Sequence, residues 1–341
     1  MSVTIHEVNS QHQFETFLNM PETLYADNFL RNTPSPNQMA EKLYHIPPEN
    51  VTFYAAVENN LVVGRVAAMV NQRHPEKDTA LFGYFESINS QPVANSLMTA
   101  VENWARSRGL EYVTGPVSYN TNDSIGMLVS GFDQPAKLGM PYNHHYYAQL
   151  LANSGYNKYF DLLAYLWSND SIPPDKLRRV AERARKNKGV VLRPLNLFYI
   201  HKEAVLLAEI HNQTMQDNWG AEQLTLPEAK QYLYEYRSYA DPDLLLAVEV
   251  NNEPAGICLT LPEWGNDSGR VAVMGVVPKY RPKGIAAMLI YETILRLKYK
   301  GYTEAEISLV MENNTMMNRI LRDTLGYKVI KRFRVYKKKV N

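Results

Sequence analysis

The chain has 341 residues, of which 45% are hydrophobic and 21% charged, a composition typical of a globular protein with about two domains. Thirty-six Lys and Arg residues against 35 Asp and Glu residues leave a net charge of +1, which disfavours nucleic acid as a partner. The single cysteine, Cys258, excludes an intrachain disulfide and a cysteine-based zinc site. The two adjacent histidines, His144 and His145, are not accompanied by further residues at the spacing of metal ligands, so no metal is expected. The sequence has no signal-peptide pattern and no apolar run of about 18 residues, which predicts a cytoplasmic protein without a membrane partner.

The first half of the chain begins with predicted strands followed by one long helix. Alternating apolar residues predict a strand at 53–57, Asn59-Asn60 predicts a turn, and a third strand is expected at 80–86. Apolar residues at helical spacing then predict a helix over 93–108. A short helix ending at Gly155-Tyr156 and a last strand close this half, so the pattern is that of a sheet flanked by helices.

A polar insertion is expected near 118–145, between the long helix and the closing strand of the first half. A loop of this length in a compact domain is usually functional or mobile. Two roles fit its residues equally well: they line the site of an acceptor molecule, or they are turn residues that cover the seam between the two halves. The residues assigned to the first role are Tyr119, Asn120, Asn122, Asp123, Tyr142 and Asn143.

The second half repeats the first after a shift of 192 residues. The shift places Asn59-Asn60 onto Asn251-Asn252 and Gly64 onto Gly256 without a gap. The Gly-Tyr pairs that close the two halves are only 171 residues apart, so the first copy carries 21 additional residues. The chain is therefore predicted to contain two copies of one domain.

The elements of the second half follow in the same order. A connector over 168–188 with a basic helix leads to a helix over 199–216, strands at 244–250 and 271–277, and a long helix over 285–300. Basic runs such as that of the connector are usually solvated faces, although they also suit tRNA or an acidic acyl carrier as a partner. The predicted domains are residues 1–167, which hold the insertion, and residues 168–341.

A phosphate-binding turn is predicted between the strand and the long helix of the second copy. Pro278 ends the strand because it has no N–H to donate, and the segment 281–286 then delivers the chain into the start of the helix. Unpaired backbone N–H groups and the positive end of the helix dipole favour phosphate oxygens at such a start. Gly284 permits a close approach of the backbone, and Arg281 and Lys283 add positive charge.

This turn resembles the pyrophosphate loop of the GNAT superfamily of acyltransferases, [Gln/Arg]-x-x-Gly-x-[Gly/Ala], at Arg281, Gly284 and Ala286. The resemblance extends to Glu312-Asn313-Asn314 after the next strand and to Leu325-Gly326-Tyr327 after a short helix. It implies an α/β (α+β) fold of two tandem GNAT-like domains, each a mixed, mostly antiparallel twisted sheet flanked by helices. It also implies a third strand that a bulge splays from the next, leaving backbone to pair with the pantetheine arm of coenzyme A.

The cofactor implied by the resemblance is acetyl-CoA or another acyl-CoA, bound by the second copy. The residues that it assigns to this cofactor are Val276, Val277, Arg281, Pro282, Lys283, Gly284, Ile285, Ala286, Asn313 and Asn314. In the first copy the repeat replaces Arg281 by Asn89, Lys283 by Gln91 and Gly284 by Pro92. Proline removes an N–H and the access that glycine gives, so one cofactor site is expected in the whole chain.

Catalytic residues are harder to assign. The tyrosine that many GNAT enzymes use as the acid is absent, since position 322 is Arg and position 321 is Leu. The candidates are Glu263 as the base and Tyr336 as the acid. The acceptor loop of GNAT proteins corresponds to the segment that contains Asn212, Asn218 and Trp219.

The resulting hypothesis is an N-acyltransferase that moves an acetyl or longer acyl group from CoA to an amine on a small molecule or a peptide. A first alternative takes the acyl or aminoacyl group from an acyl carrier or an aminoacyl-tRNA. A second alternative is a sensor that binds a CoA thioester or another small ligand without catalysis. The sequence carries no signal for an oligomeric state.

Overall fold

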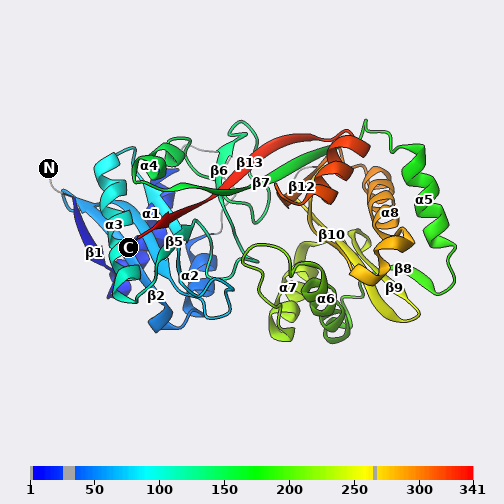
Figure 1. Ribbon diagram of the computed structural model, residues 1–341, viewed down its shortest axis with the longest axis horizontal. Helices are drawn as coiled ribbons and strands as arrows, with labels where there is room; N and C mark the ends of the chain where they lie inside the picture. Colours follow the sequence, from blue (N-terminus) through cyan, green and yellow to red (C-terminus); the bar gives the residue numbers. More distant parts are fainter. Residues whose placement is uncertain (1–2, 26–34, 264–266, 341) are drawn as a thin grey trace. The chain divides into compact units, whose positions relative to one another are not determined.

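The computed structural model describes residues 3–25, 35–263 and 267–340, and the chain forms two compact units (Figure 1). Unit 1 comprises residues 1–162 together with 331–341, and unit 2 comprises residues 163–330. Each unit is a mixed sheet with helices packed on it, as the sequence predicts. Among the described residues, no helix is both long enough and apolar enough to cross a bilayer.

Unit 1 is built on the strand order β1-β2-β3-β4-β5-β13, with β6 paired to β13. All neighbouring pairs are antiparallel except β4 and β5, which are parallel. Its strands are β1 (Thr4–Glu7), β2 (Val51–Glu58), β3 (Leu61–Met69), β4 (Thr79–Ser87), β5 (Tyr112–Gly115), β6 (Met127–Ser130) and the first part of β7 (Asn157–Ser168). Its helices are α1 (Gln11–Leu24), α2 (Pro36–Tyr44), η1 (Pro48–Asn50), α3 (Gln91–Ser107) and α4 (Tyr147–Asn153).

Unit 2 has the equivalent order β8-β9-β10-β11-β12-β7, in which β11 and β12 form the parallel pair. Figure 1 shows helices α6 and α7 on one side of this sheet and α8 with α5 on the other. Its strands are β8 (Val190–Pro194), β9 (Leu245–Val250), β10 (Glu253–Pro262), β11 (Ser268–Val276), β12 (Glu304–Met311) and the first residues of β13 (Lys328–Lys339). Its helices are α5 (Asp175–Arg185), α6 (Ile200–Thr214), α7 (Leu226–Tyr239), η2 (Pro242–Leu244), η3 (Pro278–Lys283), α8 (Ile285–Tyr299), α9 (Thr315–Asn318) and η4 (Arg319–Thr324).

The repeat seen in the sequence is also present in the backbone. Asn59 and Asn60 join β2 to β3 with φ values of 52° and 64°, and Asn251 and Asn252 join β9 to β10 with 52° and 66°. Two central residues with positive φ define the hairpin turn that matches the twist of paired strands, and Asn tolerates this conformation well. The two Asn-Asn pairs therefore fix the same hairpin in both units.

One glycine in each copy allows the long helix to approach the sheet. A Cβ atom on Gly64 would lie 2.9 Å from the side chain of Leu97 on α3. On Gly256, a Cβ atom would lie 3.2 Å from the side chains of Ile285 and Leu289 on α8. The same close packing thus explains why the sequence places glycine at these two repeated positions.

The packing units differ from the sequence repeats at the two closing strands. β7 contributes residues 163–168 to unit 2, where it follows β12 in the strand order. β13 contributes residues 331–339 to unit 1, where its segment 336–339 pairs with the segment 112–115 of β5. Each copy of the repeat therefore ends in a strand that completes the sheet of the other unit.

A buried carboxylate holds the end of β13 in unit 1. Asp161 on β7 is 1% exposed and accepts hydrogen bonds from Arg334 at 2.7 Å and 3.1 Å and from Arg332 at 3.0 Å. Lys158 adds an ion pair at 3.1 Å. Burial acts to raise the pKa of Asp161, but the bonds from Arg334, Lys158 and Arg332 outweigh it and hold the pKa below its usual value.

We predict that Asp161→Asn destabilises the protein by about 2–3 kcal/mol, because it leaves two arginines facing a neutral group. This value lies below the about 3–5 kcal/mol of fully buried pairs, since these arginines are partly exposed. A carboxylate whose pKa is lowered in the folded state stabilises the protein above its unfolded pKa of about 3.9, and this stabilisation disappears as the pH falls through the folded value. Urea unfolding from pH 7 to pH 2 measures both effects.

In the variant, the free energy of unfolding should fall less steeply below about pH 4 than in the wild type. The control is Asp323→Asn, which removes a carboxylate from an exposed ion pair with Arg322 and should leave the urea midpoint unchanged. Equal loss of stability in both variants would contradict the role given to Asp161.

Candidate functional site

The parallel strands of unit 2 separate after a short common stretch. β11 pairs with β12 only over residues 268–271 and 304–307. On its other edge β11 stays paired with β10 as far as Val276, with a register shift between Leu259 and Thr260. This bulge and the splayed strand agree with the expectation from the sequence. Beyond Val271, one edge of β11 therefore presents backbone N–H and C=O groups that no β12 residue pairs with.

The open edge of β11 leads directly to the start of α8. Gly284 precedes this helix with φ = 76°, a left-handed conformation that glycine adopts without strain. No side chain caps the helix, and its first intrahelical bond runs from the Met288 N–H to the Gly284 carbonyl. The N–H groups of residues 285–287 thus remain available to an anion at the positive end of the helix dipole.

Cations surround this helix start. Arg281 and Lys283 are exposed, and the Nε atom of Arg281 also donates to the Val276 carbonyl at 3.3 Å. The Nζ atom of Lys283 lies 5.6 Å from the ring centre of Tyr280, whose hydroxyl donates to Glu253 at 2.5 Å. The structure therefore brings the predicted segment 276–286 together as one continuous surface of strand edge, turn and helix start.

In unit 1 the equivalent gap between strands is filled by the chain itself. β4 pairs with β5 only over residues 79–81 and 112–114. Immediately beyond, the Val117 N–H donates to the Phe82 carbonyl of β4 at 2.9 Å. A Cβ atom on Gly83 would lie 2.1 Å from the Val117 carbonyl oxygen, so glycine is required for this approach. The chain that follows β5, directly before the predicted insertion, thus occupies the edge that is open in unit 2.

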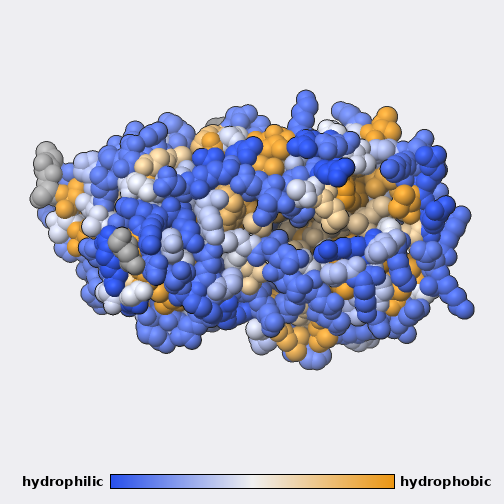
Figure 2. Space-filling view, viewed as in Figure 1, coloured by the Kyte–Doolittle hydropathy of each residue, from blue (hydrophilic) through white to orange (hydrophobic). Residues whose placement is uncertain are grey.

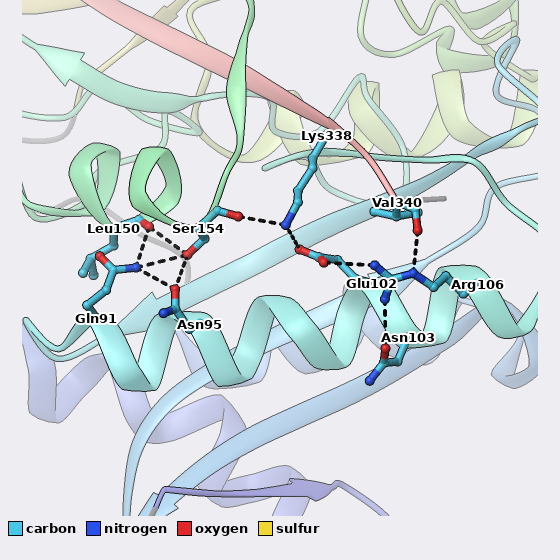
Figure 3. A network of polar contacts seen from close by, with 9 residues as sticks. All are labelled: Gln91, Asn95, Glu102, Asn103, Arg106, Leu150, Ser154, Lys338 and Val340. Atoms are coloured by element: carbon cyan, nitrogen blue, oxygen red, sulfur yellow. Dashed lines mark hydrogen bonds and ion pairs between the residues drawn. The ribbon is translucent and has the colours of Figure 1, made fainter.

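The start of α3 in unit 1 also lacks a side-chain cap, but its surroundings differ from those of the α8 start. Figure 3 shows the Gln91 side chain, which donates to the Leu150 carbonyl at 3.1 Å and to the Ser154 hydroxyl at 3.2 Å. The Tyr146 hydroxyl donates to the Ser87 carbonyl at 2.9 Å, just before this helix. Proline at position 92 removes one N–H from the first turn. Among the described residues, unit 1 therefore has no open strand edge equivalent to that of β11.

A second polar group lies on the paired stretch of β11 and β12. Arg270 is aligned with Glu306, and its guanidinium donates from Nε to the Ser308 hydroxyl at 3.0 Å and from Nη2 to the Ser308 carbonyl at 3.3 Å. Glu306 is 0% exposed. Burial lowers the pKa of Arg270, and the negative charge of Glu306 and Glu263 opposes this shift. We call Arg270, Glu306, Ser308, Glu263, Tyr236 and Tyr239 the arginine cluster.

The arginine cluster combines one residue predicted from the sequence with several that the sequence analysis missed. Glu263 was predicted as a base; it directly follows β10, and its N–H donates to the carbonyl of Ser268, where the paired stretch of β11 begins. Glu306 and Ser308 could have been found, because alternate polar residues on a buried strand point to one face. Tyr236 and Tyr239 act on Arg270 from α7, three residues apart on one face of that helix. Their approach to β11 is a tertiary contact with no local signal.

Tyr336, predicted as the acid, belongs to the core of unit 1. It is buried, it packs in the hydrophobic cluster that includes Phe82 and Val113, and it is aligned with Gly115 of β5. Burial raises its pKa. Tyr336 therefore belongs to a different unit from the turn at 281–286.

The candidate acceptor residues of the α6–α7 segment have different environments. Asn212 pairs with the backbone of Leu224, accepting from its N–H at 2.7 Å and donating to its carbonyl at 3.1 Å. Asn218 is exposed and its amide lies 3.4 Å from the Met215 sulfur, whereas Trp219 is half-buried. Asn212 thus fixes the segment that carries the other two residues.

The candidate residues of the insertion mostly hold its own backbone in place within unit 1. Asn143 is buried and bonds to both the N–H and the carbonyl of Leu128, at 2.7 Å and 3.1 Å. Asn120 accepts from the N–H of Asn122 at 2.9 Å in a turn. Other contacts of these residues include Tyr119 with Asn50 at 3.1 Å, Asp123 with Lys42 at 3.4 Å and Tyr142 with the Phe132 carbonyl at 3.4 Å.

The two asparagines predicted at the end of β12 lie at the start of α9. Asn314 caps this helix by accepting from the Met317 N–H at 3.1 Å. Asn313 is exposed, and its carbonyl accepts from the Thr315 N–H at 2.8 Å. A role of either residue toward a cofactor stays a prediction.

Comparison with known proteins shows which family unit 2 resembles. The model of the Acetyltransferase (GNAT) family matches residues 206–327, which include the open edge, the turn and the start of α8. Bacterial ceramide synthase from Caulobacter vibrioides is 30% identical, and the aligned region covers 84% of this chain and 83% of that protein. Protein YghO from Escherichia coli K12 is 27% identical over 97% of this chain and 94% of its own length.

Solved structures are similar over the whole chain. A tandem GNAT protein from the clavulanic acid biosynthesis pathway matches 100% of this chain and 99% of its own with a TM-score of 0.61 at 14% identity. A GNAT-type acetyltransferase from Sphaerobacter thermophilus matches 99% and 96% with a TM-score of 0.55 at 15% identity. These likenesses show that the fold of the chain is a tandem GNAT fold.

We predict that Asn212→Ala loosens the α6–α7 segment, because the N–H and carbonyl of Leu224 lose their partner. The cost should be about 1–3 kcal/mol of local stability. Hydrogen exchange of the amides at 215–225 should become faster, whereas Asn218→Ala, an exposed residue of the same segment, should leave it unchanged. Unchanged exchange in Asn212→Ala would show that other contacts hold the segment.

Proposed function

Because this chain belongs to the GNAT superfamily of acyltransferases, we propose that unit 2 transfers an acyl group from coenzyme A to an amine. One observation carries the proposal: the open edge of β11 runs into the uncapped start of α8, while in unit 1 the Val117 N–H pairs with the equivalent edge of β4 and Pro92 removes an N–H from the start of α3. An edge of unpaired backbone suits an extended arm with amide groups, and an uncapped helix start suits a pyrophosphate. Unit 1 is then a companion domain without a cofactor.

The residues assigned to the cofactor contribute backbone hydrogen-bond groups and positive charge. The N–H groups of residues 285–287 bind phosphate oxygens, and Gly284 lets the backbone approach them. Arg281 and Lys283 add positive charge at the same point. The backbone of residues 272–276 pairs with the pantetheine arm, as the splayed strand permits. Acyl-CoA would supply a thioester, whose carbonyl carbon is open to attack by an amine with coenzyme A as the leaving thiolate.

The arginine cluster is proposed to receive the amine and to take its proton. Glu306 lies on the strand that borders the opening, and Arg270 lies beside it with its guanidinium held by Ser308. A carboxylate in this position is a suitable general base, and the neighbouring guanidinium balances its charge in a buried place. Glu263 is the second carboxylate near Arg270. It follows the end of β10, on the opposite side of β11 from β12, and orients the same guanidinium. The thiolate can leave without a proton, since thiol pKa values lie near 8.5.

The acceptor is proposed to be a long-chain amino alcohol. The relative from Caulobacter vibrioides carries the name ceramide synthase, and a ceramide is the amide of a fatty acid with such an amine. The side chains of Ala272, Val273 and Met274 on the open part of β11 are apolar and only half-buried. Figure 2 shows apolar surface in a hollow over the strands of unit 2, which suits a hydrocarbon chain.

We predict that Gly284→Ala weakens the binding of acyl-CoA at least about 10-fold. Alanine at φ = 76° is strained by about 1–2 kcal/mol, and its Cβ would lie 3.1 Å from the side chain of Val180, so the turn must shift. Isothermal titration with palmitoyl-CoA measures the affinity and should give one site per chain of the wild type.

The matched control is Gly301→Ala, at the other end of the same helix. Gly301 has φ = 79°, and a Cβ atom there would have no neighbour within 4 Å, so its strain is similar but remote from the turn. This variant should lose stability and keep the affinity. Equal affinity in Gly284→Ala and the wild type would contradict the site, and two bound molecules per chain would contradict the role of unit 1.

We predict that Glu306→Gln lowers kcat about 100-fold without changing the affinity for palmitoyl-CoA, because the amide cannot accept the proton. Release of free CoA thiol in the presence of sphinganine measures the rate. The control is Glu304→Gln, two residues earlier on β12 and aligned with Ser268 at the start of β11, which should keep most of the activity. Full activity of Glu306→Gln would assign the base to another group, and no turnover by the wild type would favour a sensor.

A further inference from the structure

Helix α5 belongs to neither copy of the repeat, and the proposed function above leaves it unused. It lies in the connector before β8 and packs against α8 through Leu177, Ala181 and Ala184. The rest of its surface is exposed and strongly basic, with seven Lys and Arg residues and two acids between positions 175 and 188. A helix with this division has a buried apolar stripe and a charged outer face.

The acids of α5 are already neutralised within the helix. Arg178 pairs with Asp175 at 3.1 Å and with Glu182 at 3.4 Å, and Arg185 pairs with Glu292 of α8 at 2.9 Å. The other cations of this segment have no ion pair with any residue that the structure describes. These residues are Lys176, Arg179, Arg183, Lys186 and Lys188.

The basic face of α5 adjoins the turn at Gly284. A Cβ atom on Gly284 would lie 3.1 Å from Val180 and 3.3 Å from Ala184, so α5 touches the residue that begins α8. Arg183 directly precedes Ala184 and follows Val180 by three positions, which places it on the same side of the helix. Arg179 lies one turn before Arg183, on the same face.

We propose that α5 binds the 3′-phosphate of coenzyme A through Arg183 and Arg179. The inference rests on the proposed function, in which the pyrophosphate of the same molecule lies at the start of α8. The ribose phosphate is a second, doubly charged group on the same nucleotide. The one N-terminal turn of α8 is already assigned to the pyrophosphate, so the ribose phosphate needs a separate group of cations. Arginine binds phosphate oxygens with paired, charge-assisted hydrogen bonds, and exposed arginines without an acidic partner keep all their donors for this contact.

The position of the cations favours a nucleotide over an acidic carrier protein. The residues nearest to Arg183 contact Gly284 itself, so this arginine lies beside the first turn of α8 and not on a remote surface. A carrier protein brings a phosphopantetheine arm without a ribose phosphate. α5 therefore selects free coenzyme A as the donor and makes the enzyme sensitive to the presence of one phosphate group.

The test compares CoA with dephospho-CoA, which lacks only the 3′-phosphate, by isothermal titration at constant ionic strength. The wild type should bind dephospho-CoA at least about 10-fold more weakly than CoA. The double variant Arg179→Gln/Arg183→Gln should bind CoA as weakly as dephospho-CoA, with the affinity for dephospho-CoA unchanged. Arg178→Gln, on the same helix but engaged with Asp175 and Glu182, should keep the full difference.

Equal binding of CoA and dephospho-CoA by the wild type would overturn the inference and leave the proposed function intact. A double variant that weakens the binding of both ligands by the same factor would also overturn it, since α5 would then act through its overall positive charge and not through the 3′-phosphate. The wild type could instead bind a palmitoylated acyl carrier protein more tightly than palmitoyl-CoA. If the double variant lost this preference, the carrier protein and not the nucleotide would be the partner of α5, and the inference would be wrong. No binding of either nucleotide by a folded wild type would remove the proposed function as well.

Discussion

In both units the two parallel strands pair for only a few residues and then separate, and the rest of the structure depends on this separation. β11 and β12 share residues 268–271 and 304–307, and β4 and β5 share 79–81 and 112–114. Beyond this stretch, the backbone groups on one strand edge lose their partner within the sheet, and such groups are costly to bury unpaired. The two units differ in what lies in this gap.

Unit 1 fills the gap with its own chain and unit 2 does not. At one repeated position, Gly83 admits the carbonyl of Val117, whereas Gly275 contacts the Thr214 side chain of α6. The same residue type thus serves two kinds of packing in the two copies. The segment that closes the gap in unit 1 directly follows β5 and precedes the predicted insertion.

The chemistry proposed for unit 2 lies where the strands separate. The paired stretch ends next to Arg270 and Glu306, so the charged cluster lies at the point where the open edge of β11 begins. Part of this site could be predicted from the sequence, because the turn at Gly284 and the carboxylate Glu263 belong to local patterns. Glu306 was missed, since its importance comes from the alignment of β12 with β11 and not from its neighbours in the chain.

The sequence by itself determined the repeat, the hairpin turn at Asn251-Asn252 and the left-handed glycine before α8. These features follow from backbone preferences that act over a few residues, so the sequence of a single chain is enough to predict them. Only the tertiary structure decided that the closing strands exchange units and that the Val117 amide fills the gap beside β4. It also decided that the tyrosines of α7 meet Arg270. Such contacts join residues far apart in the chain, and their formation depends on packing that no local pattern records.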